Sequence, residues 1–281
     1  MNQPRTYLSL TLFTILFLSF IHSYAQTDTV IINNQKISCT VKEITPDAVK
    51  YSYPNEDLVN TVYKNTVQKI IFKSGRTQTF AEATSYKSID SVNDYNNVTI
   101  TSVESEVRGL FKIADVSSKA KGTTVYSNQE RVKDRAYRKM KIQAAMFGAN
   151  VVYLTNQRTE GNKYGSYYTN GSTTETNLTG VAYSNASPDY EQFKKLIGSR
   201  TALPAVEEFE LGASDSDVSQ SNINKMFIIG NILNESGIVY IEGNIEGERN
   251  ATRFQLANFN NDSFSIAYKD KGKAYNFVVK L

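Results

Sequence analysis

The stretch that decides the fold is SNQERVKDRAYRKMKIQAAMFGANVVYL, residues 127–154. Ser127 and Glu130 have the spacing of a capping box, which predicts the start of a helix. Largely apolar side chains follow at steps of three and four residues and form one stripe on that helix: Val132, Ala136, Met140, Gln143, Ala144 and Phe147. Gly148 predicts a left-handed end to the helix. Because Val151 starts an apolar run, we expect a helix and a core strand joined by a Gly-Ala-Asn turn.

Strand-forming stretches flank this helix on both sides. Residues 98–103 and 109–116 precede it, and residues 178–183 follow the strand that begins at Val151. A helix with one apolar face among four strands predicts a layer of helix on one face of a sheet. We therefore expect a central ββαββ module over residues 98–198.

Two β-rich parts surround the central module. In residues 26–82, short alternating strands separated by turn residues predict a small antiparallel β-barrel. Residues 225–281 have the same character and predict an antiparallel β-module of five strands. The polar residues of 81–97 and 199–224 indicate linkers. The expected fold class of the whole chain is therefore α+β, with a β-barrel, an α+β layer and a β-module in that order.

The helix and its turn carry a resemblance to bacterial envelope domains. The run AA-x2-GAN-VV at residues 144–152 resembles the central domain of the enterobacterial Rcs stress-sensing outer-membrane lipoprotein, and it is similar to small bacterial domains labelled heavy-metal-binding. This chain lacks the lipid-bearing and disulfide cysteines of the Rcs protein. The N-terminal module looks like the SH3-like small barrels of secreted Bacteroidetes proteins, which implies peptide binding or packing against neighbouring modules.

The N-terminus has the pattern of a secretory signal peptide. Arg5 gives a positive start, and residues 8–21 form an apolar run that is short for a membrane span. Ser23 and Ala25 suit a cleavage site before Gln26. An uncleaved N-terminal anchor is the alternative. After cleavage we expect no transmembrane segment, and an exported protein in the periplasm or at the periphery of the outer membrane.

Histidine and cysteine are almost absent, which excludes several classes of site. The single histidine, His22, lies in the expected signal peptide, and the single cysteine, Cys39, lies in an alternating strand pattern typical of a buried thiol. An intermolecular disulfide is the alternative for Cys39. Zinc and copper sites and Ser-His-Asp triads need more of these residues. We therefore expect no metal, no cofactor and no enzymatic activity.

The charge balance gives no sign of a nucleic-acid partner. The formal net charge is +3, an excess too small to attract a polyanion over the whole surface. Acidic residues gather at 207–217, which in principle could supply the carboxylate pair of a glycosidase. Because they lie in an expected linker, a solvated charged segment is the preferred interpretation.

A basic stripe on the central helix is the first candidate for a partner-binding surface. Arg131, Arg135 and Arg138 fall on one side of the helical wheel, opposite the apolar stripe, and Lys139 lies beside them. Such a face suits an anionic envelope polymer, lipid head groups or an acidic protein. An ordinary solvated helix face is the alternative.

A tyrosine-rich loop is the second candidate. Tyr164, Tyr167 and Tyr168 stand among Gly, Ser and Asn residues, a composition typical of adaptable contact surfaces. A disordered insertion is the alternative.

These observations together predict a secreted, non-enzymatic protein that binds or scaffolds an envelope protein or an anionic envelope polymer. A second class of function stays open, which is a periplasmic carrier that holds a small ligand between the central helix and its sheet.

Overall fold

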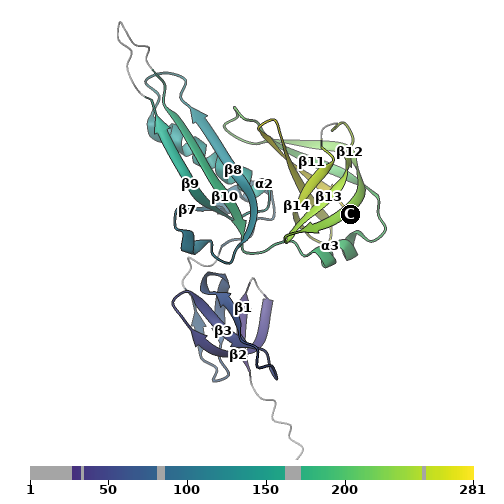
Figure 1. The fold of residues 1–281 in the computed structure, drawn as a ribbon. Helices are drawn as coiled ribbons and strands as arrows, with labels where there is room; N and C mark the ends of the chain where they lie inside the picture. Colours follow the sequence, from purple (N-terminus) through teal and green to yellow (C-terminus); the bar gives the residue numbers. More distant parts are fainter. Residues whose placement is uncertain (1–26, 33–34, 81–85, 162–171, 249–250) are drawn as a thin grey trace, which may run out of the picture.

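The protein consists of three parts that follow each other along the chain (Figure 1). The computed structural model describes residues 27–32, 35–80, 86–161, 172–248 and 251–281. An N-terminal sheet comes first, then one long helix on a second sheet, then a barrel. Among the described residues, strands account for 53% and helices for 16%. The expected class α+β is therefore wrong. The protein is mostly β, because strands also occupy much of a segment that the sequence presents as a linker.

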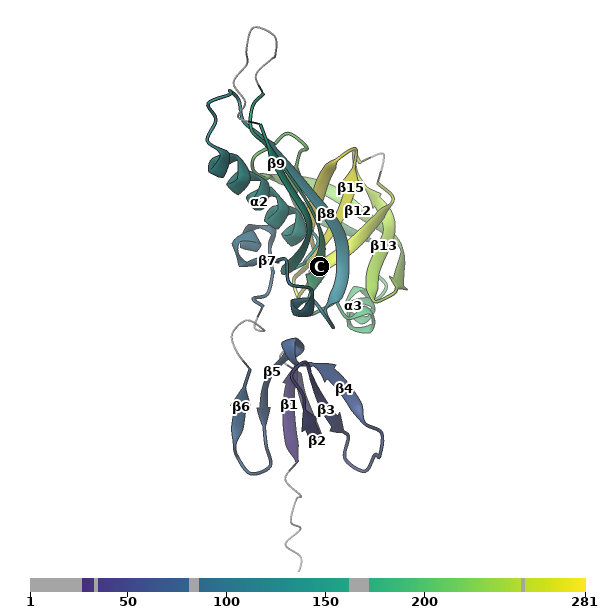
Figure 2. The ribbon, with the colours of Figure 1, turned by 60° about the vertical axis from the view of Figure 1, so that its left-hand side comes forward.

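The N-terminal part is an antiparallel sheet of six strands. They are β1 (Asp28–Ile32), β2 (Gln35–Ile44), β3 (Ala48–Ser52), β4 (Asn60–Tyr63), β5 (Val67–Ile71) and β6 (Thr77–Thr79), in the spatial order β4-β3-β2-β1-β5-β6. Figure 2 shows β4 and β6 at the two edges. The Asp28 carboxylate holds the sheet together, because it accepts from the backbone N–H groups of Val41 and Lys73, both at 2.8 Å.

The two edge strands of this sheet do not pair with each other in the described residues. A cavity of about 430 Å³ lies between them, with Tyr63 and Lys64 on one side and Gln78 and Thr79 on the other. The edge strands have only four and three residues. Strands this short offer few groups for a closing ladder, so the sheet stays open and the expected β-barrel is wrong for this part.

The central part places one helix on a four-stranded sheet. Its elements are β7 (Thr99–Thr101), β8 (Phe111–Lys121), α2 (Gln129–Met146), β9 (Val151–Glu160) and β10 (Glu175–Ser184), and the sheet order is β7-β9-β10-β8. This succession of elements is the one that the sequence predicts. β7 runs parallel to β9, whereas β10 is antiparallel to both of its neighbours. Val132, Ala136, Met140 and Ala144 are buried, so the apolar stripe faces the core.

The two ends of α2 differ in how well the sequence predicts them. The N-cap is Asn128, whose side-chain oxygen accepts from the N–H of Arg131 at 3.0 Å. The expected capping box at Ser127 is therefore wrong, since its hydroxyl oxygen accepts from the N–H of Thr124 in the preceding turn at 3.1 Å. Gly148 has a φ of 75°, which confirms the left-handed end.

The C-terminal part is a closed antiparallel barrel of six strands. They are β11 (Ala202–Leu211), β12 (Ser219–Glu235), β13 (Ile238–Ile245), β14 (Arg253–Phe259), β15 (Ser263–Asp270) and β16 (Lys273–Lys280). The strands follow each other round the barrel, and β11 pairs with β16 to close it. The expected five-stranded module and the linker over 199–224 are both wrong, because β11 and the polar first part of β12 lie in that segment.

A short helix, α3 (Tyr190–Ile197), covers one end of the barrel (Figure 1). Phe193 and Ile197 belong to the barrel core, where the Phe193 ring lies 5.2 Å from the ring of Phe264. Asp189 begins α3 by accepting from the N–H of Gln192 at 2.7 Å. This end of the barrel is therefore filled by aromatic side chains.

A bulge lets β11 contribute to two cores. The register of β11 shifts between Ala205 and Glu207 against both β12 and β16. Before the shift, Leu203 and Ala205 lie in the barrel core, and after it, Phe209 and Leu211 lie in the core beneath α2. The barrel and the central part are therefore joined through one strand with two apolar faces.

Side-chain amides attach the outer parts to the central one. From the barrel, Asn276 donates with Nδ2 to the carbonyl oxygen of Met146, the last residue of α2, at 2.7 Å. From the N-terminal sheet, Asn65 donates with Nδ2 to the carbonyl oxygens of Glu106 and Arg108 at 2.9 and 2.8 Å. The barrel contact is buried, whereas the Asn65 contacts lie nearer the surface.

Candidate functional site

The basic stripe of α2 lies against the loop between β11 and β12. Arg138 forms an ion pair with Asp217 at 2.6 Å, and Lys139 donates with Nζ to the carbonyl oxygen of Ala213 at 2.7 Å. The acidic segment 207–217 is therefore not a solvated linker. Its last residues cover part of the stripe that the sequence presents as a candidate surface.

The other two arginines of the stripe differ from each other. Arg135 donates to the carbonyl oxygen of Lys121 at 2.7 Å, whereas Arg131 is exposed to solvent. Three of the four predicted basic residues thus make contacts within the chain. Arg138 and Lys139 thus hold the barrel loop against α2, and this part of the stripe is occupied by the chain itself.

Lys139 lines a small cavity between the central part and the barrel. The cavity has a volume of about 230 Å³ and is lined by polar side chains of α2, β8 and β10: Ser117, Ser118, Lys119, Gln143, Asn177 and Thr179. Lys139 is only 5% exposed. Its burial lowers the pKa of the amine, while the charge of Asp215 acts in the opposite direction. A buried ammonium group among polar donors can hold a small anion.

The middle of the contact between α2 and its sheet is filled. Ser118 donates its hydroxyl to the carbonyl oxygen of Ala136 at 2.6 Å, and Met140 is fully buried beside them. A ligand between helix and sheet has room at the margins of this contact. One space is the Lys139 cavity, and another of about 390 Å³ lies beside Tyr137 and Gln157. The first of these contains the buried charge.

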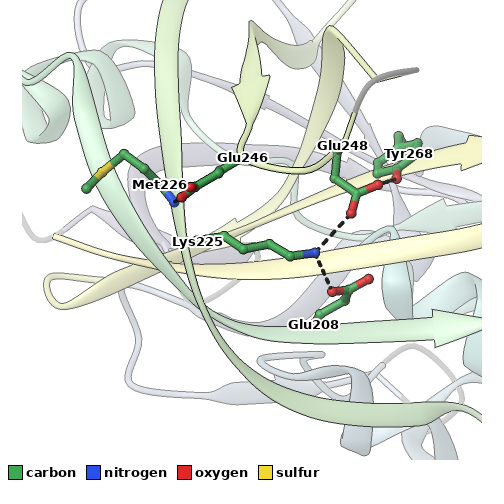
Figure 3. A network of polar contacts seen from close by, with 6 residues as sticks. All are labelled: Glu208, Lys225, Met226, Glu246, Glu248 and Tyr268. Carbon is green, nitrogen blue, oxygen red and sulfur yellow. Dashed lines mark hydrogen bonds and ion pairs between the residues drawn. The ribbon is translucent and has the colours of Figure 1, made fainter.

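Figure 3 shows a charged cluster of the barrel, formed by side chains of β11, β12 and β15 and of the segment after β13. Lys225 lies between Glu208 and Glu248, with both N–O distances at 3.0 Å. Tyr268 donates its hydroxyl to Glu248 at 2.9 Å. No local sequence pattern predicts this cluster, because its bonded partners are 17, 23 and 20 positions apart along the chain.

The surroundings of this cluster set the protonation of its two donors. Burial lowers the pKa of Lys225, but the hydrogen bonds and charges of Glu208 and Glu248 outweigh burial, so the pKa lies above its ordinary value. Burial, followed by the hydrogen bond to Glu248, raises the pKa of Tyr268. Lys225 and Tyr268 therefore stay protonated near neutral pH and act as hydrogen-bond donors, which suits a polar cap on the barrel core.

Cys39 is a buried thiol, as the strand pattern predicts. Burial raises its pKa to about 11, so the thiol stays protonated and unreactive near neutral pH.

In the part of the chain that the structure describes, no three metal-binding side chains lie together. No helix there has the length and apolar character needed to cross a membrane. The tyrosine-rich loop with Tyr164, Tyr167 and Tyr168 lies outside the described residues.

An apolar surface lies at the edge strand β4, which pairs with β3 on one side and with no described strand on the other. Tyr53, Leu58, Val59 and Tyr63 are exposed, with Leu58 at 68% and Val59 at 50%. Together with Thr61 in the middle of the strand, they form what we name the β4 edge surface. Tyr63 belongs to β4, Leu58 and Val59 directly precede it, and Tyr53 follows β3. Exposed apolar side chains gathered beside one strand edge are unusual on a protein surface and are typical of docking sites.

The hydrogen bonds of β4 show which of its backbone groups face outward. Lys64, the residue after β4, donates its N–H to the carbonyl oxygen of Asp47 at 2.8 Å. Antiparallel neighbours exchange bonds at alternate residues, so residues 60 and 62 also bond to β3. The N–H and C=O of Thr61 therefore point to the open side of β4, where no described strand lies.

The other edge of the same sheet has a different character. β6 has the sequence Thr-Gln-Thr, and beside it the guanidinium of Arg76 lies 3.9 Å from the centre of the Phe72 ring. Short polar strands with a nearby charge usually protect a sheet edge from unwanted pairing. The β4 edge carries exposed apolar side chains instead.

No sequence signal singles out the β4 edge surface, because Leu58 and Val59 resemble ordinary strand residues until the sheet order places them at an edge.

Comparison with protein-family models, with curated proteins and with solved structures gives no match. The basis for a function is therefore the geometry of the surfaces themselves.

Proposed function

We propose that this chain is a secreted, non-enzymatic protein of the cell envelope that binds or scaffolds another protein through the β4 edge surface. One observation carries the proposal, which is an unprotected strand edge beside the exposed side chains of Leu58 and Val59. An extended segment added beside β4 would bond to the outward N–H and C=O of Thr61. Its own side chains would cover the apolar ones.

A protein segment suits this surface better than an anionic polymer does. Glu56 and Asp57 lie before β4, and Lys64 follows it. Both signs of charge are therefore present along one edge, and a polyanion would meet repulsion at one end. Two residues of the basic stripe, Arg138 and Lys139, already bond to the barrel loop, which weakens the case for a polyanion.

Export is the part of the proposal that rests on residues 1–25, and these lie outside the described residues. The signal-peptide pattern predicts a mature chain that begins at Gln26. The mass of the exported protein tests this. A chain that keeps residues 1–25, or one that carries a lipid, would contradict it.

Docking at the β4 edge can be tested with one proline in each edge strand. Thr61→Pro removes the outward N–H of β4 and leaves its bonds to β3 in place. Thr79→Pro is the matched control, because Phe80 bonds to Gln68 of β5 and Thr79 therefore faces outward on β6. Affinity capture from envelope extracts with the wild-type chain should recover a protein that Thr61→Pro loses and Thr79→Pro retains. Equal recovery by all three chains would contradict the proposal.

A second candidate function, a carrier of a small anionic ligand, is favoured by the Lys139 cavity. Its volume of about 230 Å³ suits a ligand with few non-hydrogen atoms. Calorimetric titration with acetate, succinate and inorganic phosphate tests it. Lys139→Met keeps the apolar stem and removes the charge, and Lys133→Met on the same helix is the control. Heat of binding that only Lys139→Met abolishes would favour the carrier, and no binding by the wild-type chain would dismiss it for these anions.

A further inference from the structure

We infer that β4 pairs with β4 of a second copy of this chain, so that two N-terminal sheets form one continuous sheet about a twofold axis. The inference rests on the proposed docking surface and names its occupant. Twofold pairing is the commonest way in which chains assemble, and it requires a surface that is complementary to itself. The residues along β4 meet that requirement.

The outward backbone groups restrict how two copies of β4 can pair. Only residues that face away from β3 can exchange bonds, so odd-numbered residues of one copy must lie opposite odd-numbered residues of the other. With the axis at Asn60, Val59 lies opposite Thr61 of the second copy, and Leu58 lies opposite Val62. With the axis at Thr61 instead, Leu58 would lie opposite Lys64, which places an apolar side chain against a charge. The first register is therefore favoured.

Charges at the two ends of the edge fit the same register. Glu56 of one copy lies opposite Lys64 of the other, and the symmetry repeats this pair at the far end. Neither residue forms an ion pair within the described parts of a single chain. Arg108 lines the same cavity as Lys64, and Asp57 stands next to Glu56. Two acidic groups of one copy thus approach two basic groups of the other.

Asn60, on the proposed axis, has an unsatisfied hydrogen-bond donor. Its Nδ2 is buried and has no acceptor among the described residues. Unpaired buried donors are rare in native proteins. In the favoured register Asn60 lies opposite Asn60 of the second copy as a non-hydrogen-bonded pair, the closest kind of antiparallel pair. Rotation of the two side chains would let the amides bond to each other.

The mass of the mature chain in solution tests the inference first. Sedimentation equilibrium over roughly 1 to 100 µM should show a concentration-dependent dimer. Thr61→Pro should weaken the dimer by at least about tenfold, because each copy loses an N–H of the shared ladder. Thr79→Pro should leave it unchanged. Circular dichroism establishes that each variant is folded. A dimer that survives Thr61→Pro, or one that both prolines disrupt equally, overturns the inference.

A charge exchange tests the register without touching the backbone. Glu56→Lys places lysine opposite Lys64 twice per dimer and should weaken dimerisation roughly tenfold. Adding Lys64→Glu to the same chain restores opposite charges and should restore the dimer. Failure of the double variant to recover the dimer, in a chain that circular dichroism shows to be folded, overturns the register.

The same experiments separate the inference from the proposed function. A chain that is monomeric throughout the concentration range overturns self-pairing. If that monomer still captures an envelope protein in a way that Thr61→Pro abolishes, the proposed docking function stands without the dimer. If it captures nothing, both are overturned.

Discussion

The N-terminal sheet and the C-terminal barrel each use six antiparallel strands, yet only the barrel closes. In the barrel the strands that meet, β11 and β16, have ten and eight residues. In the sheet the edge strands have four and three. Long outer strands supply enough backbone groups to satisfy each other, whereas short ones leave theirs for solvent or for another chain. The length of the outer strands thus separates a self-contained module from one that can pair.

The hydrophobic core of the barrel is also larger than that of the N-terminal sheet. Aromatic rings fill the barrel, and several of them are fully buried: Phe193, Phe227, Phe254, Phe264 and Phe277. The sheet encloses a smaller core of Val30, Cys39, Val49, Tyr51, Val67, Ile70 and Phe80. A smaller core stabilises less, so we expect the sheet to unfold before the barrel does.

The largest expected effects come from one core deletion in each part. Phe277→Ala should lower the stability of the barrel by about 3–5 kcal/mol, and Val49→Ala should lower that of the sheet by about 2 kcal/mol, since both side chains are fully buried and leave cavities. Scanning calorimetry should show two transitions, each moved by only one of the variants. A single transition shifted by both would mean that sheet and barrel unfold together.

A matched pair of glycines tests how firmly the barrel and the N-terminal sheet are each attached to the central part. Gly148 and Gly109 have similar φ values, 75° and 78°, so alanine strains the backbone equally at both. A Cβ on Gly148 would lie 2.2 Å from the carbonyl oxygen of Ala257 in the barrel, whereas one on Gly109 would meet the exposed ring of Tyr63.

Because a backbone carbonyl in a barrel moves less easily than a surface ring, Gly148→Ala should cost about 2–4 kcal/mol and Gly109→Ala about 1–2 kcal/mol. Chemical denaturation of the two variants measures the difference. Equal losses would show that the sheet is held as rigidly as the barrel.

Alkaline pH should lower the stability of the N-terminal sheet before it lowers that of the barrel. The pKa of Cys39 in the folded sheet is about 11, above its ordinary value of 9.0, so the stability that the protonated thiol supports is complete below pH 9 and is lost as the pH rises through 11. Lys225 in the barrel also has a raised pKa, but from an ordinary value of 10.5, so its contribution is lost only at higher pH.

Melting curves between pH 8 and about pH 11 should therefore show the sheet weakening first, and Cys39→Ala should make it less sensitive to pH. Lys225→Met should change only the barrel transition. A barrel that weakens before the sheet would contradict these assignments.

The smallest expected effects concern the contact that joins the barrel to α2. Arg131→Gln should change stability by no more than about 0.5 kcal/mol, because Arg131 is exposed. Asp217→Asn weakens the ion pair to Arg138 and should cost up to about 1 kcal/mol, less in high salt. Thermal melts at two salt concentrations measure both. A larger loss from Arg131→Gln than from Asp217→Asn would mean that the exposed end of the stripe has a contact of its own.

The central helix was the most predictable element because local and tertiary preferences agree there. The apolar stripe repeats over the whole of α2, and Gly148 both ends the helix and allows the close approach to Ala257. The N-cap was harder to assign, because Ser127 and Asn128 are both good caps and only the preceding turn decides between them.

The barrel was less predictable because its strands are irregular. The bulge after Ala205 interrupts the alternation of β11, and β12 begins with the polar residues 219–222, so the segment resembles a linker. The contact between the basic stripe and the barrel loop cannot be predicted from the sequence, for a different reason. Arg138 and its partner Asp217 are 79 positions apart, and nothing local relates them. The β4 edge surface likewise depends on sheet order, which the sequence leaves open.

The bulge in β11 also limits how this chain can change in length. Side chains alternate along a strand, so an insertion or deletion of one residue between Ala205 and Glu207 would reverse every side chain on one side of it. Phe209 and Leu211 would turn into the barrel, and Glu208 would turn into the apolar layer beneath α2. Substitutions in this segment change one contact, whereas a change of length exchanges the contents of two cores. The few residues at the bulge therefore tolerate substitution better than they tolerate a change of length.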